Sequence, residues 1–117
     1  MKKLYRVKKN EEIKRILDNR CVSSTPYLSL YTYKNLETNH IRYAISVSKK
    51  IGKAVIRNKI KRHITAVIDN SNLKIDSNID FFIIVRGKIL ELSYQELYKN
   101  LNYLFRKQDL IKGENNE

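Results

Sequence analysis

The spacing of apolar residues divides the chain into helical and extended segments. The stretch NEEIKRIL begins at Asn10 and carries Ile13, Ile16 and Leu17 at helical intervals behind two acidic residues, so it predicts a short helix with Asn10 as its N-cap. The run YLSLYTY, residues 27–33, alternates instead, which places its leucines on one face of a strand and its tyrosines on the other. We expect the leucine face to contact the core.

Two strands and a longer helix are predicted downstream. The segment IRYAISVS, residues 41–48, predicts a second strand, which we expect to be the antiparallel partner of the first in a hairpin or meander. From Gly52 to Ile68 the apolar period is that of a helix. Its buried arc consists of Ile56, Ile60, Ile64 and Val67. The uninterrupted apolar run IDFFIIVR, residues 79–86, is typical of a central strand that is covered on both faces.

The C-terminal part predicts one more helix. Ser93 and Glu96 have the spacing of a capping box, and a helical apolar stripe follows them. The stripe consists of Leu97, Leu101, Leu104 and Phe105. We expect a disordered tail from about residue 110. Because we find no repeat, linker or low-complexity block, residues 1–117 are predicted to form a single domain.

Charge adds most to this picture, because the 117 residues carry a formal net charge of +12. No Asp or Glu occurs between Glu37 and Asp69. The cations in this gap are Arg42, Lys49, Lys50, Lys53, Arg57, Lys59, Lys61 and Arg62. Such a block indicates a polyanionic partner. Nucleic acid is favoured over a membrane surface, because no broad Trp, Phe or Leu face accompanies the cations and no lipidation signal is present.

The predicted helix over residues 52–68 places polar and cationic residues beside its apolar arc. This second arc consists of Arg57, Asn58, Lys61, Arg62 and Thr65. Like charges four residues apart on a helix repel by roughly a few tenths of a kcal/mol, so a face that is merely solvated would normally mix signs. Phosphates offset the repulsion well, since Arg can hold phosphate oxygens with two parallel donors and Asn58 can add an amide. The pattern therefore predicts phosphate binding.

The tyrosine face of the first strand has two open interpretations. Tyr27, Tyr31 and Tyr33 could stack on unpaired bases or give hydroxyls to a nucleic-acid backbone. They could equally pack beneath a helix, since tyrosine is a good strand former. The residues alone do not decide between these two roles.

Patterns for catalysis or cofactor binding are scarce. Neither His40 nor His63 lies in an H-x-E or H-E-x-x-H pattern, and we interpret both as surface or helix-flank residues. The glycines lie too far apart for a nucleotide-binding loop, and no acid lies within the basic segment to bind Mg²⁺. Cys21 is the only cysteine, and we interpret it as a filler or surface thiol. With no apolar run long enough for a membrane span and no signal peptide, we expect a cytoplasmic protein without a membrane or small-molecule partner.

At SVSKKIGKAVIRNKIKRHI, residues 46–64, the sequence resembles the protein subunit of bacterial ribonuclease P. The similarity continues in order through YRVKKNEEIKRIL, LYTY and FFIIVR. The resemblance implies an α+β fold, an α/β sandwich in which a small, mainly antiparallel sheet packs with about three helices and contains a left-handed βαβ crossover. It also implies that the partner RNA, with bound Mg²⁺, is the catalyst. The protein would then be an enzyme only as a subunit, assisting removal of the 5′ leader from precursor tRNA.

The resemblance assigns roles to particular residues. The RNA-binding positions are Lys49, Lys50, Lys53, Arg57, Asn58, Lys61 and Arg62, and the leader-binding cleft corresponds to Ile13, Leu17 and Tyr31. Many relatives have Phe at the first two cleft positions, where this chain keeps apolar contact but loses base stacking. The family's basic motif commonly ends with Arg where this chain has Thr65, and His63 or Lys59 are candidate substitutes for that contact. No catalytic or metal-binding residue is expected in the protein.

Two other functions compete with this prediction. A general RNA-binding or ribosomal-type protein would carry the same charge without a role in tRNA cleavage, and the ordered series of motifs argues against it. A protein-only nuclease would need a carboxylate or histidine cluster, which the sequence does not show.

Overall fold

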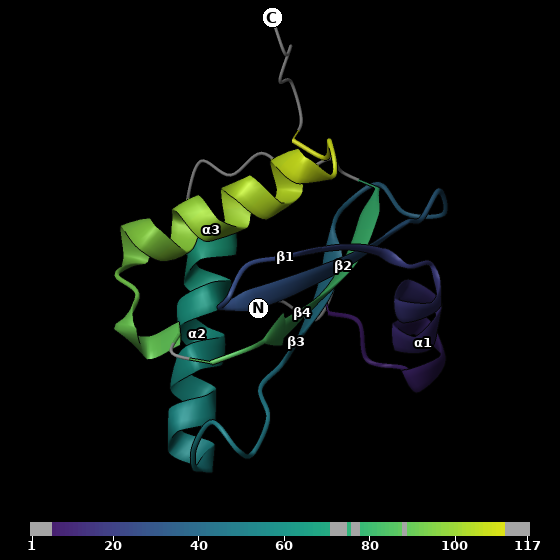
Figure 1. Ribbon diagram of the computed structural model, residues 1–117. Coiled ribbons are helices and arrows are strands. Elements are labelled where there is room, and N and C mark those ends of the chain that lie inside the picture. The colour runs from purple at the N-terminus through teal and green to yellow at the C-terminus, as the bar shows by residue number, and fades with distance from the viewer. Residues whose placement is uncertain (1–5, 71–74, 76–77, 88, 112–117) are drawn as a thin grey trace, which may run out of the picture.

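The computed structural model describes residues 6–70, 75, 78–87 and 89–111 of the chain. Its elements are α1 (Asn10–Asp18), β1 (Cys21–Ser24), β2 (Leu28–Lys34), β3 (Arg42–Ser46), α2 (Ala54–Asn70), β4 (Ile79–Val85), the short 3-10 helix η2 (Ile89–Glu91) and α3 (Tyr94–Lys107). In Figure 1 the sheet lies between α1 on one side and α2 and α3 on the other.

The four strands of the sheet have the order β1-β2-β4-β3. β2 pairs antiparallel with both β1 and β4, whereas β3 runs parallel to β4. The predicted hairpin between residues 27–33 and 41–48 is therefore wrong, because β4 lies between the two strands. β4 is the most continuously apolar strand, and the central position covers it best. The link from β3 to β4 passes through α2, which makes it a βαβ crossover.

The sequence pattern does not predict the edge strand β1. Its residues, CVSS, carry no alternating apolar pattern, and tertiary hydrogen bonds hold it in place. Ser24 Oγ lies 2.9 Å from Ser29 Oγ on β2, and Ser23 Oγ donates to the carbonyl oxygen of Leu104 in α3 at 3.1 Å. Pairing with β2 and contact with α3 therefore determine this strand.

The main core lies between the sheet and the pair of helices α2 and α3. Leu28 and Leu30 of β2 are fully buried on this side, as the alternation predicts. The helices contribute Ile60, Ile64, Val67, Leu97, Leu101, Leu104 and Phe105, all of them buried. Both predicted apolar stripes are confirmed, although Ile56 at the start of the first is only half-buried.

The two predicted helix starts have different outcomes. The capping box is confirmed: Ser93 Oγ accepts the Glu96 N–H at 3.1 Å, and Glu96 Oε1 accepts the Ser93 N–H at 2.8 Å. The hydrogen bond from the Ser93 backbone also lowers the pKa of Glu96. The N-cap predicted for α1 is wrong, because Lys9 is the N-cap and Asn10 is already helical. The Lys9 carbonyl accepts the Ile13 N–H at 3.1 Å, so the helix begins one residue earlier than expected.

Part of the predicted tail is described and ordered by contacts. Leu110 and Ile111 pack against the core, and Ile111 forms a β-bridge with Ile75. The prediction of disorder for residues 112–117 falls outside the described residues.

Candidate nucleic-acid interface

α2 and the turn before it carry a basic face, which consists of Lys49, Lys50, Lys53, Arg57, Asn58, Lys61 and Arg62. All of these residues except Arg57 are exposed. Arg57 is half-buried, and its Nε donates to the carbonyl oxygen of Gly52 at 3.2 Å. The structure thus brings every predicted RNA-binding residue together on one helix and the turn that leads into it.

The turn before α2 gathers lysines at the start of the helix. Ser48 Oγ accepts the Lys50 N–H at 3.1 Å, which shapes the turn. Gly52 permits a close approach, because a Cβ there would lie 2.9 Å from Cγ2 of Ile56. The first turn of α2 contains no acidic residue, so the lysines meet the positive end of the helix dipole without compensation. This arrangement disfavours the isolated helix and favours a bound anion.

Ion pairs within the described residues occur on α1 and at its contact with the sheet, away from the basic face. Lys14 pairs with Asp18 on the surface of α1, and Arg15 and Arg42 pair with the buried Asp80. No cation of the basic face forms an ion pair with any residue that the structure describes. Its charge is therefore available to an external anion such as a phosphate.

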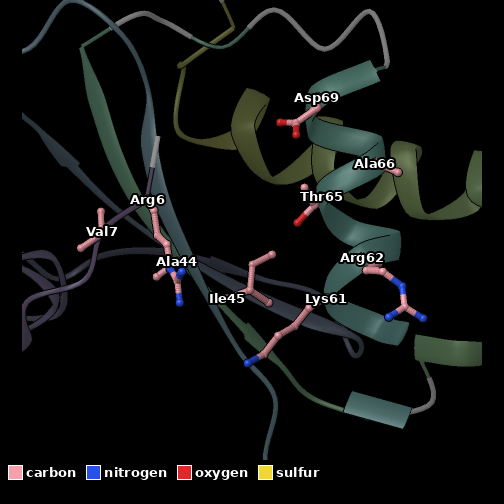
Figure 2. Close-up of a pocket in the computed structure, with 9 residues that line it drawn as sticks. All are labelled: Arg6, Val7, Ala44, Ile45, Lys61, Arg62, Thr65, Ala66 and Asp69. Carbon is pink, nitrogen blue, oxygen red and sulfur yellow. The ribbon is translucent and has the colours of Figure 1, made fainter. Parts of the chain in front are cut away.

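A pocket of about 580 Å³ opens beside the basic face, between α2, the edge strand β3 and the N-terminal segment (Figure 2). Its walls include Lys61, Arg62 and Thr65 from α2, Ala44 and Ile45 from β3, and Arg6 from the N-terminal segment. The structure therefore places an arginine across the pocket from Thr65, which the sequence did not indicate.

The pocket also contains one carboxylate, that of Asp69. The Tyr43 hydroxyl donates to Asp69 Oδ1 at 2.9 Å. Burial raises the pKa of Tyr43, and the hydrogen bond to Asp69 raises it further. The phenol stays protonated at neutral pH and keeps this carboxylate in a hydrogen bond.

The two candidate substitutes for the contact at Thr65 lie elsewhere on α2. Lys59 and His63 line a different pocket, together with Ile89 and Leu92. The His63 ring makes an edge contact with the ring of Tyr94, with 6.3 Å between centroids. Neither residue lines the pocket beside Thr65, so the structure does not support either as a substitute.

The predicted cleft residues lie on the α1 side of the sheet. Ile13, Leu17 and Tyr31 are all half-buried. Between Ile13 and Leu17 on α1, Ile16 is fully buried. The residues predicted for the cleft are thus present on one face, with Tyr31 as its one predicted aromatic.

The strand register adds a second aromatic to this face. Tyr31 pairs with Val22 of β1 and with Phe82 of β4, and Phe82 pairs with Ala44 of β3. We call these four residues the aromatic row, after its two aromatic members, Tyr31 and Phe82. Val22 is exposed and the other three are half-buried, so no member of the row is sealed from solvent.

The sequence prediction missed Phe82 because IDFFIIVR was interpreted as a strand that is covered on both faces. The alternation within the run carries the missing signal: Phe81 is fully buried, whereas Phe82 is only half-buried. Which of the two phenylalanines faces outward depends on pairing with β2, and that pairing is not visible in the local pattern.

The open question about the tyrosine face has a different answer for each residue. The Tyr33 ring is covered by Arg15, whose guanidinium carbon lies 4.8 Å from the ring centroid. Tyr27 packs against the main core. Tyr31, a member of the aromatic row, has neither kind of cover among the described residues and is half-buried.

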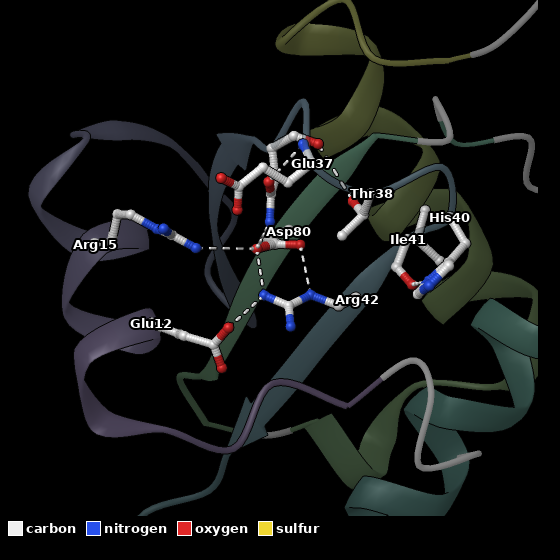
Figure 3. A network of polar contacts seen from close by, with 9 residues as sticks. Glu12, Arg15, Glu37, Thr38, His40, Ile41, Arg42 and Asp80 are labelled. Atoms are coloured by element: carbon white, nitrogen blue, oxygen red, sulfur yellow. Dashed lines mark hydrogen bonds and ion pairs between the residues drawn. The ribbon is translucent and has the colours of Figure 1, made fainter.

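A buried polar network holds α1 against the sheet (Figure 3). Asp80 is completely buried and accepts hydrogen bonds from Arg42 Nε at 3.1 Å, Arg42 Nη2 at 2.8 Å and Asn35 Nδ2 at 3.0 Å. Arg42 Nη2 also donates to Glu12 of α1 at 2.8 Å, and Arg15 approaches Asp80 at 3.9 Å. The hydrogen bond to Asp80 raises the pKa of Arg42. Arg42 therefore belongs to the internal framework and is not part of the basic face.

The described residues contain no group of three or more His, Cys, Asp or Glu side chains placed to hold a metal ion. In the same part of the chain no helix is both long and apolar enough to cross a membrane. An α+β sandwich with an unpaired cationic helix face defines a small basic domain of the nucleic-acid-binding class.

Comparisons with known proteins identify the family. A family model described as Ribonuclease P matches residues 1–109. The chain is 37% identical over 112 residues to the ribonuclease P protein component of Geobacillus kaustophilus, an alignment that covers 96% of this chain and 93% of the relative. It is 38% identical over 110 residues to the ribonuclease P protein component of Bacillus cereus, covering 94% and 96%.

Solved structures agree with the sequence relatives. The ribonuclease P protein of Staphylococcus aureus matches with a TM-score of 0.80 and 31% identity, over 92% of this chain and 98% of that chain. The ribonuclease P protein of Thermotoga maritima matches with a TM-score of 0.76 and 25% identity, over 86% and 96%.

The chain belongs to the ribonuclease P protein family. It is thus a protein subunit of an endoribonuclease with a role in tRNA 5′ processing and with an RNA partner in the holoenzyme. The predicted family and the predicted α+β fold are confirmed. The roles of the basic face and of the cleft stay predictions.

Proposed function

We propose that the basic face binds the catalytic RNA of ribonuclease P, and that the α1 side of the sheet binds the 5′ leader of precursor tRNA. The protein thereby assists endonucleolytic removal of the leader, which gives the mature tRNA 5′ end. The observation that carries this proposal is a run of exposed cations without ion-pair partners among the described residues. Phosphate contacts supply most of the affinity in such interfaces and release counterions on binding.

The leader site is proposed to use the aromatic row together with Ile13 and Leu17. Tyr31 and Phe82 are neighbours across two strands, and both are partly open to solvent. Single-stranded RNA binds through bases that stack on such side chains. Ile13 and Leu17 add apolar contact from α1, and Phe82 supplies an aromatic surface that those two positions lack.

The chemistry of cleavage is proposed to belong to the RNA partner. Mg²⁺ prefers hard oxygen ligands and binds readily to RNA phosphates, so we propose that the RNA holds most of the metal. The protein contributes cations that offset repulsion between the two RNAs, and it contributes no catalytic side chain. We propose the cytoplasm as the place of this reaction.

Reconstitution with the cognate catalytic RNA tests the proposal. We expect the purified protein to stimulate cleavage of precursor tRNA at low Mg²⁺ and to strengthen binding of leader-containing substrate. RNA binding without any stimulation would support a general RNA-binding protein instead. Cleavage by the protein without catalytic RNA would contradict the assignment of the chemistry to RNA.

Salt dependence tests the basic face itself. Arg57→Ala and Arg62→Ala should each weaken binding to catalytic RNA and lower the magnitude of the slope of log K against log salt by about 1. Lys99→Ala is the matched control, because Lys99 is an exposed cation on α3, away from the basic face. Slopes equal to that of the control would remove Arg57 and Arg62 from the interface.

A further inference from the structure

The arc of polar and cationic residues along α2 is interrupted where the pocket of Figure 2 begins. Lys61 and Thr65 are one helical turn apart and line the same pocket. Thr65 is short and neutral, so α2 presents less positive charge here than in the preceding turn. At this point a cation from another element would add to the charge of Lys61.

Arg6 is placed to supply that cation. The N-terminal segment runs alongside β3, where Arg6 forms a parallel bridge with Tyr43 and the Val7 N–H donates to the Tyr43 carbonyl at 3.0 Å. The backbone at Arg6 is therefore held by the sheet edge. Its side chain is exposed and forms no ion pair with the described part of the chain.

The pocket separates its positive and negative groups. In Figure 2 the side chains of Arg6 and Lys61 extend toward the same end of the pocket, and Asp69 lies toward the other end. Asp69 already accepts a hydrogen bond from Tyr43. The end toward which Arg6 and Lys61 extend therefore carries a planar guanidinium and an ammonium group, both of which are donors suited to phosphate oxygens.

We propose that Arg6 and Lys61 bind one RNA phosphate in this pocket, so that the N-terminal segment completes the phosphate-binding surface where α2 carries Thr65. The inference rests on the proposed function, since it names a further residue of the same RNA-binding surface. The ligand is a phosphodiester group, which either the catalytic RNA or the precursor-tRNA leader can supply.

A rescue experiment tests the proposal. Arg6→Ala should weaken RNA binding about tenfold, the effect of losing one charge-assisted contact, and lower the salt slope by about 1. Thr65→Arg places a guanidinium on the opposite wall of the pocket, so adding it to Arg6→Ala should restore most of the affinity and the slope. Arg6→Lys should keep the slope but recover only part of the affinity, because Lys lacks the planar fork of donors.

Two binding measurements identify the source of the phosphate. One measures the affinity of the protein for catalytic RNA, and the other measures the affinity of the assembled holoenzyme for precursor tRNA with and without its leader. A loss in the first measurement assigns the phosphate to the catalytic RNA, and a loss only with leader-containing substrate assigns it to the leader. Both results support the pocket.

Several outcomes would overturn the inference. Arg6→Ala with unchanged affinity in both measurements, or a loss that Thr65→Arg does not restore, excludes a phosphate shared by the two walls. Unfolding by urea checks that Arg6→Ala is as stable as Lys99→Ala, which serves again as the exposed-cation control. If the unmodified protein neither binds catalytic RNA nor stimulates cleavage, the proposed function fails, and this result is distinct from a failure of Arg6 alone.

Discussion

Different interactions hold the helices against the two sides of the sheet. On the α2 and α3 side, Phe81 is completely buried, stacked on Tyr43 at 4.9 Å and in edge contact with Phe105 at 5.0 Å between ring centroids. On the α1 side, the next residue along the same strand, Phe82, stays partly exposed beside Tyr31. Of these two adjacent residues of β4, Phe81 thus lies in a fully buried core and Phe82 lies on a partly exposed surface.

The α1 side depends on directed polar contacts. The buried carboxylate of Asp80 fixes Arg42, and Arg42 in turn fixes Glu12 at the start of α1. Apolar burial is non-directional and tends to cover a whole face, whereas hydrogen bonds and ion pairs hold a helix at particular points. The difference shows how a small domain can keep one stable core and still leave part of its sheet free for a ligand.

The largest expected effect is a loss of stability when the core between the sheet and the helices α2 and α3 is disrupted. Phe81→Ala removes a ring that is packed between two others and should lower the free energy of unfolding by about 3 to 5 kcal/mol. Urea unfolding followed by circular dichroism measures this change. Phe82→Ala, one residue away on the open side, is the matched control and should cost clearly less. Equal losses for the two variants would contradict the difference between the faces.

The next largest expected effect is a loss of stability when the buried polar network on the α1 side is broken. Asp80→Asn leaves the mostly buried guanidinium of Arg42 with Glu12 as its remaining carboxylate partner. The variant should lower the free energy of unfolding by about 3 kcal/mol, near the lower end for a broken buried ion pair. The same urea experiment measures it. Asp18→Asn breaks the exposed pair with Lys14 and should change stability little. Similar stability for the two variants would show that the buried network does not hold α1.

A smaller effect, on binding rather than stability, should follow from Phe82→Leu. Leucine keeps apolar contact on the open side but cannot stack as an aromatic ring does, so holoenzyme affinity for leader-containing substrate should fall about tenfold. A leader that keeps its phosphates but lacks its bases should bind both proteins equally. Tyr103→Leu, which removes an exposed aromatic from α3, is the control and should leave leader affinity unchanged. A loss that persists without bases would exclude stacking on Phe82.

The smallest expected effect separates helix stability from RNA binding. Ser93→Ala removes the cap of α3 and should lower the free energy of unfolding by about 1 kcal/mol. Affinity for catalytic RNA should not change, because α3 covers the sealed side. Thermal unfolding and RNA titration measure the two quantities, and a loss of RNA affinity would show that α3 takes part in the interface.

Local patterns determined the elements that carry their own signal. The alternation around Leu28 and Leu30, the capping box at Ser93 and the helical stripe at Ile60 and Ile64 are all where the sequence predicts them. Each of these features depends on residues within a few positions of one another, so a single segment contains the information. The family assignment rests on similar local evidence, a motif of many residues in order.

Long-range pairing decided what the local patterns missed or misplaced. Three features depend on which strand lies beside which. They are the strand order β1-β2-β4-β3 in place of the predicted hairpin, the presence of strand β1, and the partly exposed position of Phe82.

The sequence by itself determined the basic face, because charge and helical period lie within one segment from Lys49 to Arg62. Only the tertiary structure decided that Arg42 is used internally and that Arg6 lies across a pocket from Thr65. The physical reason is that these side chains meet residues far away in the chain, and such contacts form only when the whole sheet is assembled.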